Sequence, residues 1–386
     1  MKVLKVGGGV LTGPEPVRAL VGLVKPGRFA LVVSAFGKTT NHLEQVVEAF
    51  LRGDEHGALE GFDAIIEWHR DLAAVLGVSW RSAGIPETVA DIRHHMTRPS
   101  SIPAAAFADR VVALGEQLSS RIVASFLAAS GVPAHWIDAT RVVRTDDSFG
   151  RARVLWEPTR QALRSSVGEL AREGIPIIAG FIGSAADGAT TTLGREGSDY
   201  TAALVGAALD ADEVVLLKNV PGVLTADPGM VPDAHTIPQL SFDQAQRLFR
   251  AGAKVVHPKT IGPLRDVGIP LRVAAFPSLE TGTTIGAGRS WGSAGIRAVA
   301  TRQSGRNALR TSVQGNHDGL LSVLAEPPLT STSVRRVDDT VQALHLTVRH
   351  RDTGRGTWIT LVDPDGAADA MRGLHMLVDY RREEQR

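Results

Sequence analysis

Residues 181–204 have the sequence FIGSAADGATTTLGREGSDYTAAL. The stretch follows an apolar run, Ile175–Ala179, that predicts a buried strand, and it ends in small and apolar residues that predict a helix. The loop between them is rich in glycine and carries Arg195, Ser198 and Asp199. Free backbone N–H groups and the helix dipole make such a strand–loop–helix junction a favourable anion site. The alternative is an ordinary loop in which Ser198 or Asp199 caps the helix.

The composition excludes several classes of protein. A chain of 386 residues exceeds one typical hydrophobic core, so we expect two domains. The 42 basic and 41 acidic residues leave a net charge of +1, which makes nucleic acid a poor partner but still allows a small anionic ligand. The absence of cysteine excludes disulfides, thiolate catalysis and cysteine-ligated zinc.

The N-terminal residues predict a strand rather than a signal peptide, because Lys2 is followed directly by the apolar residues Val3 and Leu4. No apolar run is expected to be long enough to span a bilayer. We therefore expect a cytoplasmic protein that does not associate with a membrane.

Strand-like and helical patterns alternate along most of the chain. The expected strands are Lys2–Val6, Phe29–Ser34, Ile175–Ala179, Glu213–Leu217 and Ile269–Ala274. The expected helices are Thr39–Arg52, Phe62–Leu76, Ala105–Ala129, Trp156–Glu173, Ser198–Leu209 and Ser241–Ala251. This alternation predicts an α/β fold, a mostly parallel sheet sandwiched by helices.

Glycines and hydroxyl groups occur where the expected strands end. Gly7, Gly8 and Gly9 follow the first strand, Ser34 ends the second, and Gly180 follows the strand before the anion loop. In parallel sheets ligands bind at the carboxyl ends of the strands, where these loops meet. The sequence therefore predicts one binding site at that edge of the sheet.

The composition changes near Ile285. Residues 286–295 are rich in glycine and serine and predict a domain boundary. Beyond it, Ala343–Arg349 and Thr357–Val362 predict half-buried strands, and Ala367–Leu377 predicts a helix. A small α+β domain is therefore expected at the C-terminal end of the sequence.

Eight motifs occur in the order and spacing of a known family. They are KVGG (5–8), VVSAFGKTTN (32–41), GEQLSS (115–120), WIDA (136–139), RTDD (144–147), TTLGREGSDY (191–200), PGVLTADP (221–228) and GAKVVHP (252–258). On these motifs the chain resembles the amino-acid kinase family, and specifically the aspartate kinases. The resemblance covers residues 1–286 and implies that they form the catalytic domain.

The remaining residues, 287–386, differ more from the family. Regulatory aspartate kinases end in two ACT domains, which bind lysine or threonine and help to form the dimer. These residues are too few for two such domains, so the resemblance implies a degenerate or single ACT-like domain. We expect a homodimer with weak feedback regulation, and a specialised pathway is one interpretation of the shortened region.

The resemblance also implies a reaction. Aspartate kinases use MgATP to phosphorylate the side-chain carboxylate of L-aspartate, giving 4-phospho-L-aspartate and ADP. Both substrates are anionic, so fixed cations and N–H dipoles must offset their repulsion. An ionised carboxylate is already a nucleophile, so no strong base is needed. The implied cofactors are ATP and Mg²⁺, and the implied partner is a small amino acid.

The family roles can be assigned to residues of this chain by resemblance. The catalytic residues are Lys5, which contacts the transferring phosphoryl group, and Asp199, which orients Lys5. The substrate residues are Arg195 for the α-carboxylate, Glu116 for the ammonium group, and Ser34, Thr40 and Ser198 for hydrogen bonds to the carboxylates. The nucleotide residues are Lys5, Gly7, Gly8, Gly9, Lys218, Asn219 and Lys254, and no residue is assigned as a metal ligand.

Several positions depart from the usual motifs of aspartate kinases. They are Gly9 and Val10 in place of Thr and Ser, Glu196 in place of Gly, Asn219 in place of Asp, and Gly229 in place of Arg. Two alternatives therefore stay open: a kinase for another amino acid or carboxylate, and an inactive amino-acid-binding homologue that acts as a sensor or partner protein. The retained Lys5, Asp199 and Lys254 favour an aspartate kinase.

Overall fold

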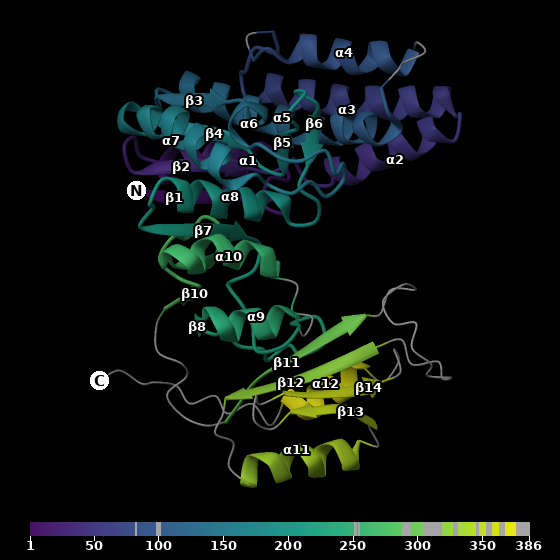
Figure 1. Ribbon diagram of the computed structural model, residues 1–386, viewed down its shortest axis with the longest axis vertical. Helices are drawn as coiled ribbons and strands as arrows, with labels where there is room; N and C mark the ends of the chain where they lie inside the picture. The colour runs from purple at the N-terminus through teal and green to yellow at the C-terminus, as the bar shows by residue number, and fades with distance from the viewer. Residues whose placement is uncertain are drawn as a thin grey trace. The chain divides into compact units, whose positions relative to one another are not determined.

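The chain forms two compact units, shown in Figure 1. The computed structural model describes residues 1–81, 83–97, 102–250, 253, 255–287, 295–303, 319–326, 331–344, 347–352, 357–362 and 367–375. The N-terminal unit consists of Met1–Val220 and Lys259–Thr281. The C-terminal unit consists of Pro221–Pro258 and Gly282–Arg386.

A parallel sheet forms the centre of the N-terminal unit. Its strands are β1 (Lys2–Val6), β2 (Phe29–Val33), β3 (Ala134–Ile137), β4 (Ile175–Ala179), β7 (Glu213–Lys218) and β9 (Leu271–Ala275). They lie in the order β3-β4-β2-β1-β7-β9, and each neighbouring pair is parallel. Lys5 on β1 is paired with Val32 on β2 and with Leu216 on β7. Runs of valine, isoleucine and leucine favour such strands, which are buried on both faces.

Helices surround this sheet. They are α1 (Pro14–Leu23), α2 (Thr39–Leu51), α3 (Glu55–Val75), α4 (Ile85–Thr97), α5 (Ala104–Ala129), α6 (Ala139–Val142), α7 (Trp156–Glu173), α8 (Gly197–Ala208) and α10 (Pro258–Val267). Helix α5 packs against β2, β3 and β4, whereas α8 packs against β1, β2 and β7. Strands β5 (Ile182–Ser184) and β6 (Thr190–Thr192) form an antiparallel hairpin just before α8. The predicted α/β sandwich is confirmed.

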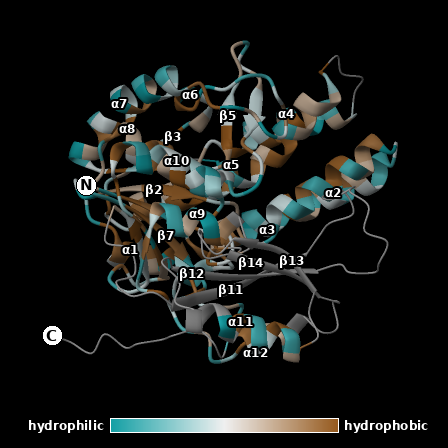
Figure 2. Ribbon diagram, turned by 60° about the horizontal axis from the view of Figure 1, so that its bottom comes forward, coloured by the Kyte–Doolittle hydropathy of each residue, from teal (hydrophilic) through white to brown (hydrophobic). Residues whose placement is uncertain are grey.

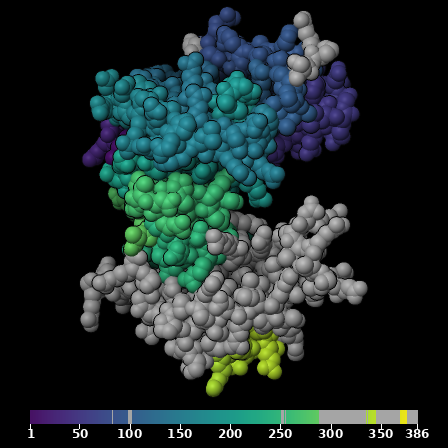
Figure 3. All heavy atoms as spheres, viewed as in Figure 1, coloured from purple at the N-terminus to yellow at the C-terminus, as the bar shows by residue number. Residues whose placement is uncertain are grey.

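The core of this unit consists of aliphatic side chains from the strands and from the helices that cover them. Strands β2 and β7 are coloured as apolar in Figure 2, whereas α2 and α3 also carry polar residues. On the face shown in Figure 3, the atoms of the unit form a closely packed surface. Close packing of the buried aliphatic side chains keeps the ends of the strands in fixed positions.

Helix α5 is long and apolar enough, by length and composition, to cross a membrane, unlike the other helices of the described chain. The expectation that no apolar run reaches this length is therefore wrong. In the structure 72% of the most apolar stretch of this helix is buried inside the protein. Phe107, Leu114 and Ile122 are among the buried residues of α5. A helix at the centre of a core has the same composition as a membrane span, because both are apolar on nearly all sides.

Most of the predicted elements are confirmed with small shifts. Strand β4 and helix α7 have the predicted bounds. Helix α3 begins at Glu55, well before the predicted Phe62, because the Asp54 carboxylate caps it by accepting a hydrogen bond of 2.9 Å from the Gly57 N–H. Helices α1, α4 and α10 and strand β3 were not predicted. Each of these helices contains proline, which is typical of loops and turns, and β3 has only 4 residues.

The C-terminal unit contains a second sheet. Strands β11 (Gly295–Gln303), β12 (Gly319–Glu326), β13 (Thr347–Asp352) and β14 (Thr357–Val362) form a 4-stranded antiparallel sheet in the order β11-β12-β14-β13. The unit also contains the parallel pair β8 (Gln239–Ser241) and β10 (Thr283–Gly286), and helices α9 (Phe242–Arg250), α11 (Ser331–Ala343) and α12 (Ala367–His375). The expected α+β character is confirmed.

One C-terminal prediction is wrong in part. The strand expected over Ala343–Arg349 begins only at Thr347, because α11 continues to Ala343. Val337 and Val341 are buried one helical turn apart, and this spacing favours the helix that ends at Ala343.

Candidate active site

Asp199 lies at the centre of a charge cluster at the carboxyl end of the parallel sheet. It belongs to the first turn of α8, and its side chain is 0% exposed. Lys5 Nζ lies 2.6 Å from Asp199 Oδ1, and Lys218 Nζ lies 2.8 Å from Oδ2. Since β1 and β7 are neighbouring strands, the two lysines approach the carboxylate from adjacent positions. The structure thus brings together three of the predicted site residues.

The electrostatics of the cluster keep it charged. Burial alone raises the pKa of Asp199, but the ammonium groups of Lys5 and Lys218 outweigh burial and hold the pKa below its usual range. Burial lowers the pKa of Lys218, but the carboxylates of Asp199 and Glu196 outweigh that effect and raise the pKa. Asp199 therefore stays ionised and holds two charged ammonium groups at the end of the sheet.

Glu196 adds a second carboxylate to this cluster. It is the residue before α8, has a left-handed backbone with φ of 54°, and places Oε2 3.6 Å from Lys218 Nζ. Burial raises the pKa of Glu196, Lys218 lowers it, and the charge of Asp199 raises it further. The carboxylate that departs from the family motif thus faces the predicted phosphate site.

Lys259 is a further cation that the sequence analysis missed. Its Nζ donates a hydrogen bond of 2.7 Å to the backbone oxygen of Leu193 and lies 5.5 Å from the centre of the Tyr200 ring. Burial lowers its pKa, although the charges of Glu196 and Asp199 act in the opposite direction. In the sequence, Lys259 could have been recognised from the preceding Pro258, because proline is typical of the first position of a helix.

The glycine loop after β1 packs closely against its neighbours. A Cβ atom on Gly8 would lie 2.8 Å from the backbone oxygen of Ala35 and 3.0 Å from that of Gly37, which is too close for any side chain. A Cβ atom on Gly9 would lie 3.8 Å from the Asn219 side chain. The loop after β1, the loop after β2 and the end of β7 therefore lie side by side, as predicted from the positions of the glycines.

Glu116 is the buried carboxylate on the other side of the site. It lies in the middle of α5, is 3% exposed, and its Oε2 has no hydrogen-bond partner among the described residues. Burial raises its pKa to about 8, an effect that the hydrogen bond from Ala35 and the charge of Lys5 reduce only in part. An unsatisfied buried oxygen of this kind is a good acceptor for an ammonium group of a ligand.

The predicted hydroxyl groups lie at the same edge of the sheet. Ser34 follows β2 and is buried, and Thr40 lies in the first turn of α2 and is half-buried. Ser198 is buried against Gly180, where an added Cβ atom would lie 2.7 Å from Ser198 Oγ. The glycine after β4 is therefore required by the close approach of α8.

Two predicted residues are not placed in the cluster. The Arg195 side chain is exposed and forms no hydrogen bond or ion pair with any described residue. Lys254 lies outside the described residues. Within the described ranges, no three His, Asp or Glu side chains gather as a metal site.

Asp109 supports the anion loop and was also missed. Both of its carboxylate oxygens accept hydrogen bonds of 2.9 Å from the Gly150 N–H, and Thr192 donates from its N–H at 2.7 Å and from Oγ1 at 2.9 Å. Burial raises its pKa, and these hydrogen bonds oppose the shift. Asp109 thereby fixes α5 to the β5–β6 hairpin that precedes residues 193–199, and a lone aspartate in an apolar helix was its signal in the sequence.

Comparison with known proteins places this site in context. Residues 1–275 match the model of the amino acid kinase family. The chain is 32% identical over 317 residues to aspartokinase 2, chloroplastic, of Arabidopsis thaliana, a match that covers 78% of this chain and 57% of that protein. It is 30% identical over 319 residues to an aspartokinase of Chlamydia muridarum, which covers 80% of this chain and 68% of that protein. The chain thus spans little more than half of the plant relative.

Solved structures share the fold. Aspartokinase III of Escherichia coli, in complex with aspartate and ADP, superposes with a TM-score of 0.84. The match covers 98% of this chain and 99% of that chain at 24% sequence identity.

Proposed function

Because the chain belongs to the amino acid kinase family, we propose that it transfers a phosphoryl group from MgATP to the side-chain carboxylate of L-aspartate, giving 4-phospho-L-aspartate and ADP. The observation that carries this proposal is the pair of ammonium groups on Lys5 and Lys218, which Asp199 holds at 2.6 and 2.8 Å. Two fixed cations beside a glycine loop can neutralise the charge that develops during phosphoryl transfer.

The nucleotide would bind on the side of the glycine loop. Ammonium and backbone N–H groups suit the oxygens of a polyphosphate, and a Cβ atom on Gly7 would lie 3.4 Å from Lys5 Nζ, so the missing side chain keeps that approach open. Lys5, Gly7, Gly8, Gly9, Lys218, Asn219 and Lys254 are the proposed nucleotide residues. Mg²⁺, when bound, would neutralise phosphate charge, and the phosphates would supply most of its ligands because both oxygens of Asp199 already face lysines.

The amino acid would bind between α5 and the loops after β2 and β4. The unpartnered Oε2 of Glu116 is suited to its ammonium group, and the exposed fork of Arg195 to its α-carboxylate. Ser34, Thr40 and Ser198 would donate hydrogen bonds to the carboxylates. The reacting carboxylate is ionised at neutral pH, so the chain has only to align it with the phosphoryl group and neutralise charge.

We also propose the domain roles, the location, the oligomeric state and the regulation that the resemblance implies. Residues 1–286 would act as the catalytic domain and residues 287–386 as a single ACT-like domain in a cytoplasmic homodimer. The 4-stranded antiparallel sheet with its two helices supports an α+β domain there. Feedback inhibition by lysine or threonine would be weak, and a specialised pathway for the product would fit that property.

The test is ADP release from MgATP across a panel of amino acids, with hydroxylamine present to trap any acyl phosphate. Aspartate-dependent hydroxamate is the expected result, and a reaction without an amino acid supplies the background. Turnover with a different amino acid but not with aspartate would show that aspartate is not the substrate, while phosphoryl transfer to a carboxylate would remain the proposed reaction. Amino-acid binding without any turnover would favour an inactive sensor or partner protein.

A further inference from the structure

Lys218 faces two carboxylates that differ in burial. Asp199 is fully buried, and each of its oxygens pairs with a different lysine. The Glu196 side chain is 38% exposed, and its contact with Lys218 Nζ is longer, at 3.6 Å. Because one end of Glu196 reaches solvent, its carboxylate can leave Lys218 at little free-energy cost, whereas Asp199 cannot.

The charges of the four paired groups cancel in this arrangement, and Lys259 is a further cation that acts on both carboxylates. Lys5 and Lys218 supply two positive charges, and Asp199 and Glu196 supply two negative charges. A polyphosphate carries several negative charges and needs a site with positive excess. Movement of Glu196 toward solvent would create that excess without disturbing the pair of Lys5 with Asp199.

The backbone of Glu196 points to a role for this side chain. Its φ of 54° lies in the left-handed region, which glycine adopts without strain and other residues adopt at a cost. A strained residue that faces a buried cation is an observation from which a functional role can be inferred.

We propose that Glu196 is a placeholder carboxylate, which pairs with Lys218 in the nucleotide-free protein and is displaced by the nucleotide phosphates. This inference rests on the proposed function, which identifies the ligand as a nucleotide. Glu196 thereby sets the affinity of the site for polyphosphates, because every ligand must first displace it. Lys5, Asp199 and Lys259 also act electrostatically on Glu196, and among the described residues Lys218 forms an ion pair with it.

The experiment measures ADP and inorganic triphosphate binding by calorimetry, with and without Mg²⁺. Glu196→Gln removes the charge and is expected to tighten ADP binding about threefold to tenfold, an effect that high salt reduces. Glu169→Gln removes one charge from an exposed position on α7 and should leave the affinity unchanged. Glu196→Gly is expected to tighten binding like the Gln variant and also to raise the melting temperature, because glycine tolerates the backbone conformation.

A double-mutant cycle identifies Lys218 as the partner. In a Lys218→Met background, Glu196→Gln is expected to change ADP affinity little, because the cation that Glu196 shields is gone. Unchanged or weaker ADP binding by Glu196→Gln would overturn the proposal, as would a gain that persists without Lys218. Weaker binding only in the presence of Mg²⁺ would assign Glu196 to the metal and would overturn it equally.

The result separates this inference from the proposed function. Tighter binding by Glu196→Gln in a protein that phosphorylates no amino acid would support the placeholder and contradict the kinase. Aspartate phosphorylation with unchanged binding by the variant would do the reverse. If neither the native protein nor the variant binds ADP or triphosphate, both proposals fail.

Discussion

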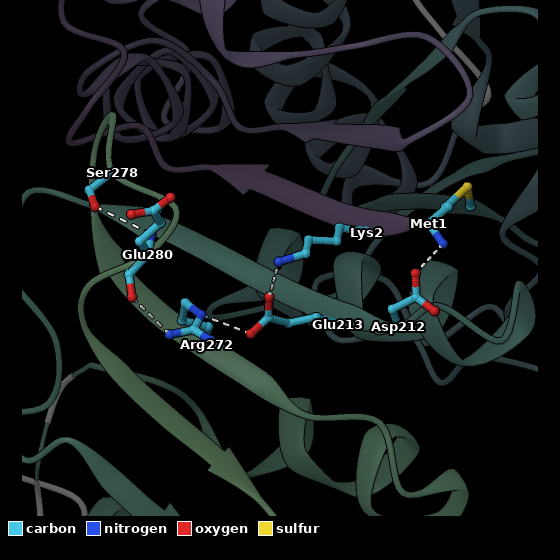
Figure 4. A network of polar contacts seen from close by, with 7 residues as sticks. All are labelled: Met1, Lys2, Asp212, Glu213, Arg272, Ser278 and Glu280. Carbon is cyan, nitrogen blue, oxygen red and sulfur yellow. Dashed lines mark hydrogen bonds and ion pairs between the residues drawn. The ribbon is translucent and has the colours of Figure 1, made fainter.

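The two ends of strands β1 and β7 each hold a carboxylate between two cations, but they differ in what surrounds it. At the amino end, the Glu213 carboxylate accepts hydrogen bonds from Lys2 Nζ at 2.7 Å and from Arg272 Nε at 2.8 Å, as Figure 4 shows. The guanidinium of Arg272 also donates to the backbone oxygen of Glu280 at 3.3 Å. Both oxygens of Glu213 are therefore occupied by groups on neighbouring strands.

At the carboxyl end, Asp199 also pairs with two cations, but its Oδ1 forms an ion pair with Lys5 and no hydrogen bond among the described residues. Glu116 Oε2 lacks a partner there among the described residues, and the Glu196 side chain reaches solvent. A carboxylate between two cations can therefore serve only to stabilise the fold, as Glu213 does. Unsatisfied and movable groups beside it are what indicate a binding site.

Lysines on one strand give the sharpest test of this difference. Lys5→Ala is expected to lower aspartate-dependent ADP release by about a hundredfold to a thousandfold, the usual effect of removing one group that stabilises a transition state. Lys2→Ala, three residues earlier on β1, should leave turnover close to that of the native protein. Equal losses in the two variants, at equal melting temperatures, would contradict the distinction between the two ends.

Removal of the amino-end carboxylate should affect stability instead. Glu213→Ala leaves the cations of Lys2 and Arg272 without their shared partner and is expected to lower the free energy of unfolding by about 2 kcal/mol, less than for a fully buried pair because both cations are partly exposed. Denaturant unfolding measures the change. Turnover per folded molecule should stay the same, and a selective loss of turnover would place Glu213 in the active site.

Glu116, whose Oε2 has no hydrogen-bond partner among the described residues, should make substrate binding depend on pH. The pKa of Glu116 is raised to about 8 in the folded protein, from 4.5 as its ordinary value. Its protonated form therefore contributes stability that is full below about pH 4.5 and is lost as the pH rises through about 8. An ammonium ligand needs the ionised form, so amino-acid affinity should rise about fivefold between about pH 7 and pH 8.

Calorimetric titration with aspartate over this range measures the effect. Glu116→Gln should bind aspartate weakly and without the rise, since its side chain does not ionise. A flat profile in the native protein would show that Glu116 does not receive the ammonium group.

The smallest effect is expected at the exposed edge of the amino end. The N-terminal ammonium of Met1 pairs with Asp212, whose side chain is 75% exposed. Solvent screens such a pair, so Asp212→Asn should leave both the melting temperature and turnover unchanged. A clear loss of stability would mean that the amino-end network extends to the surface.

The parts of the fold that were predicted depend on local pattern. The apolar runs of β1, β4 and β7 and the glycines after β1 and β4 are visible in the sequence, and they predict the edge of the sheet at which the site lies. The roles of Lys5 and Lys218 came from the family resemblance. Asp199 follows from its place at a helix N-terminus. Helix α1 was missed although its apolar residues are periodic, because Pro14 and Pro16 are typical of a loop. Strand β3 was missed because its 4 residues carry too little pattern.

The rest of the site depends on contacts between distant segments, which no local pattern reveals. Asp109 meets Thr192 across 83 residues of chain, and Lys259 meets Leu193 across 66. The left-handed backbone of Glu196 is equally hidden, because propensity favours glycine at such a position and this chain has a glutamate. Conversely, Arg195 was predicted as a site residue, but its side chain is exposed and contacts no polar group of the described residues.

The contact at Gly8 has a consequence for protein engineering. A Cβ atom there would lie too close to the backbone oxygens of Ala35 and Gly37, so a change in the loop after β2 directly affects the loop after β1. A library that varies residues 34–40, in the proposed amino-acid site, would therefore also affect the proposed nucleotide loop at residues 7–9. Selections for a new acceptor should keep Gly8 constant and screen both Michaelis constants in parallel.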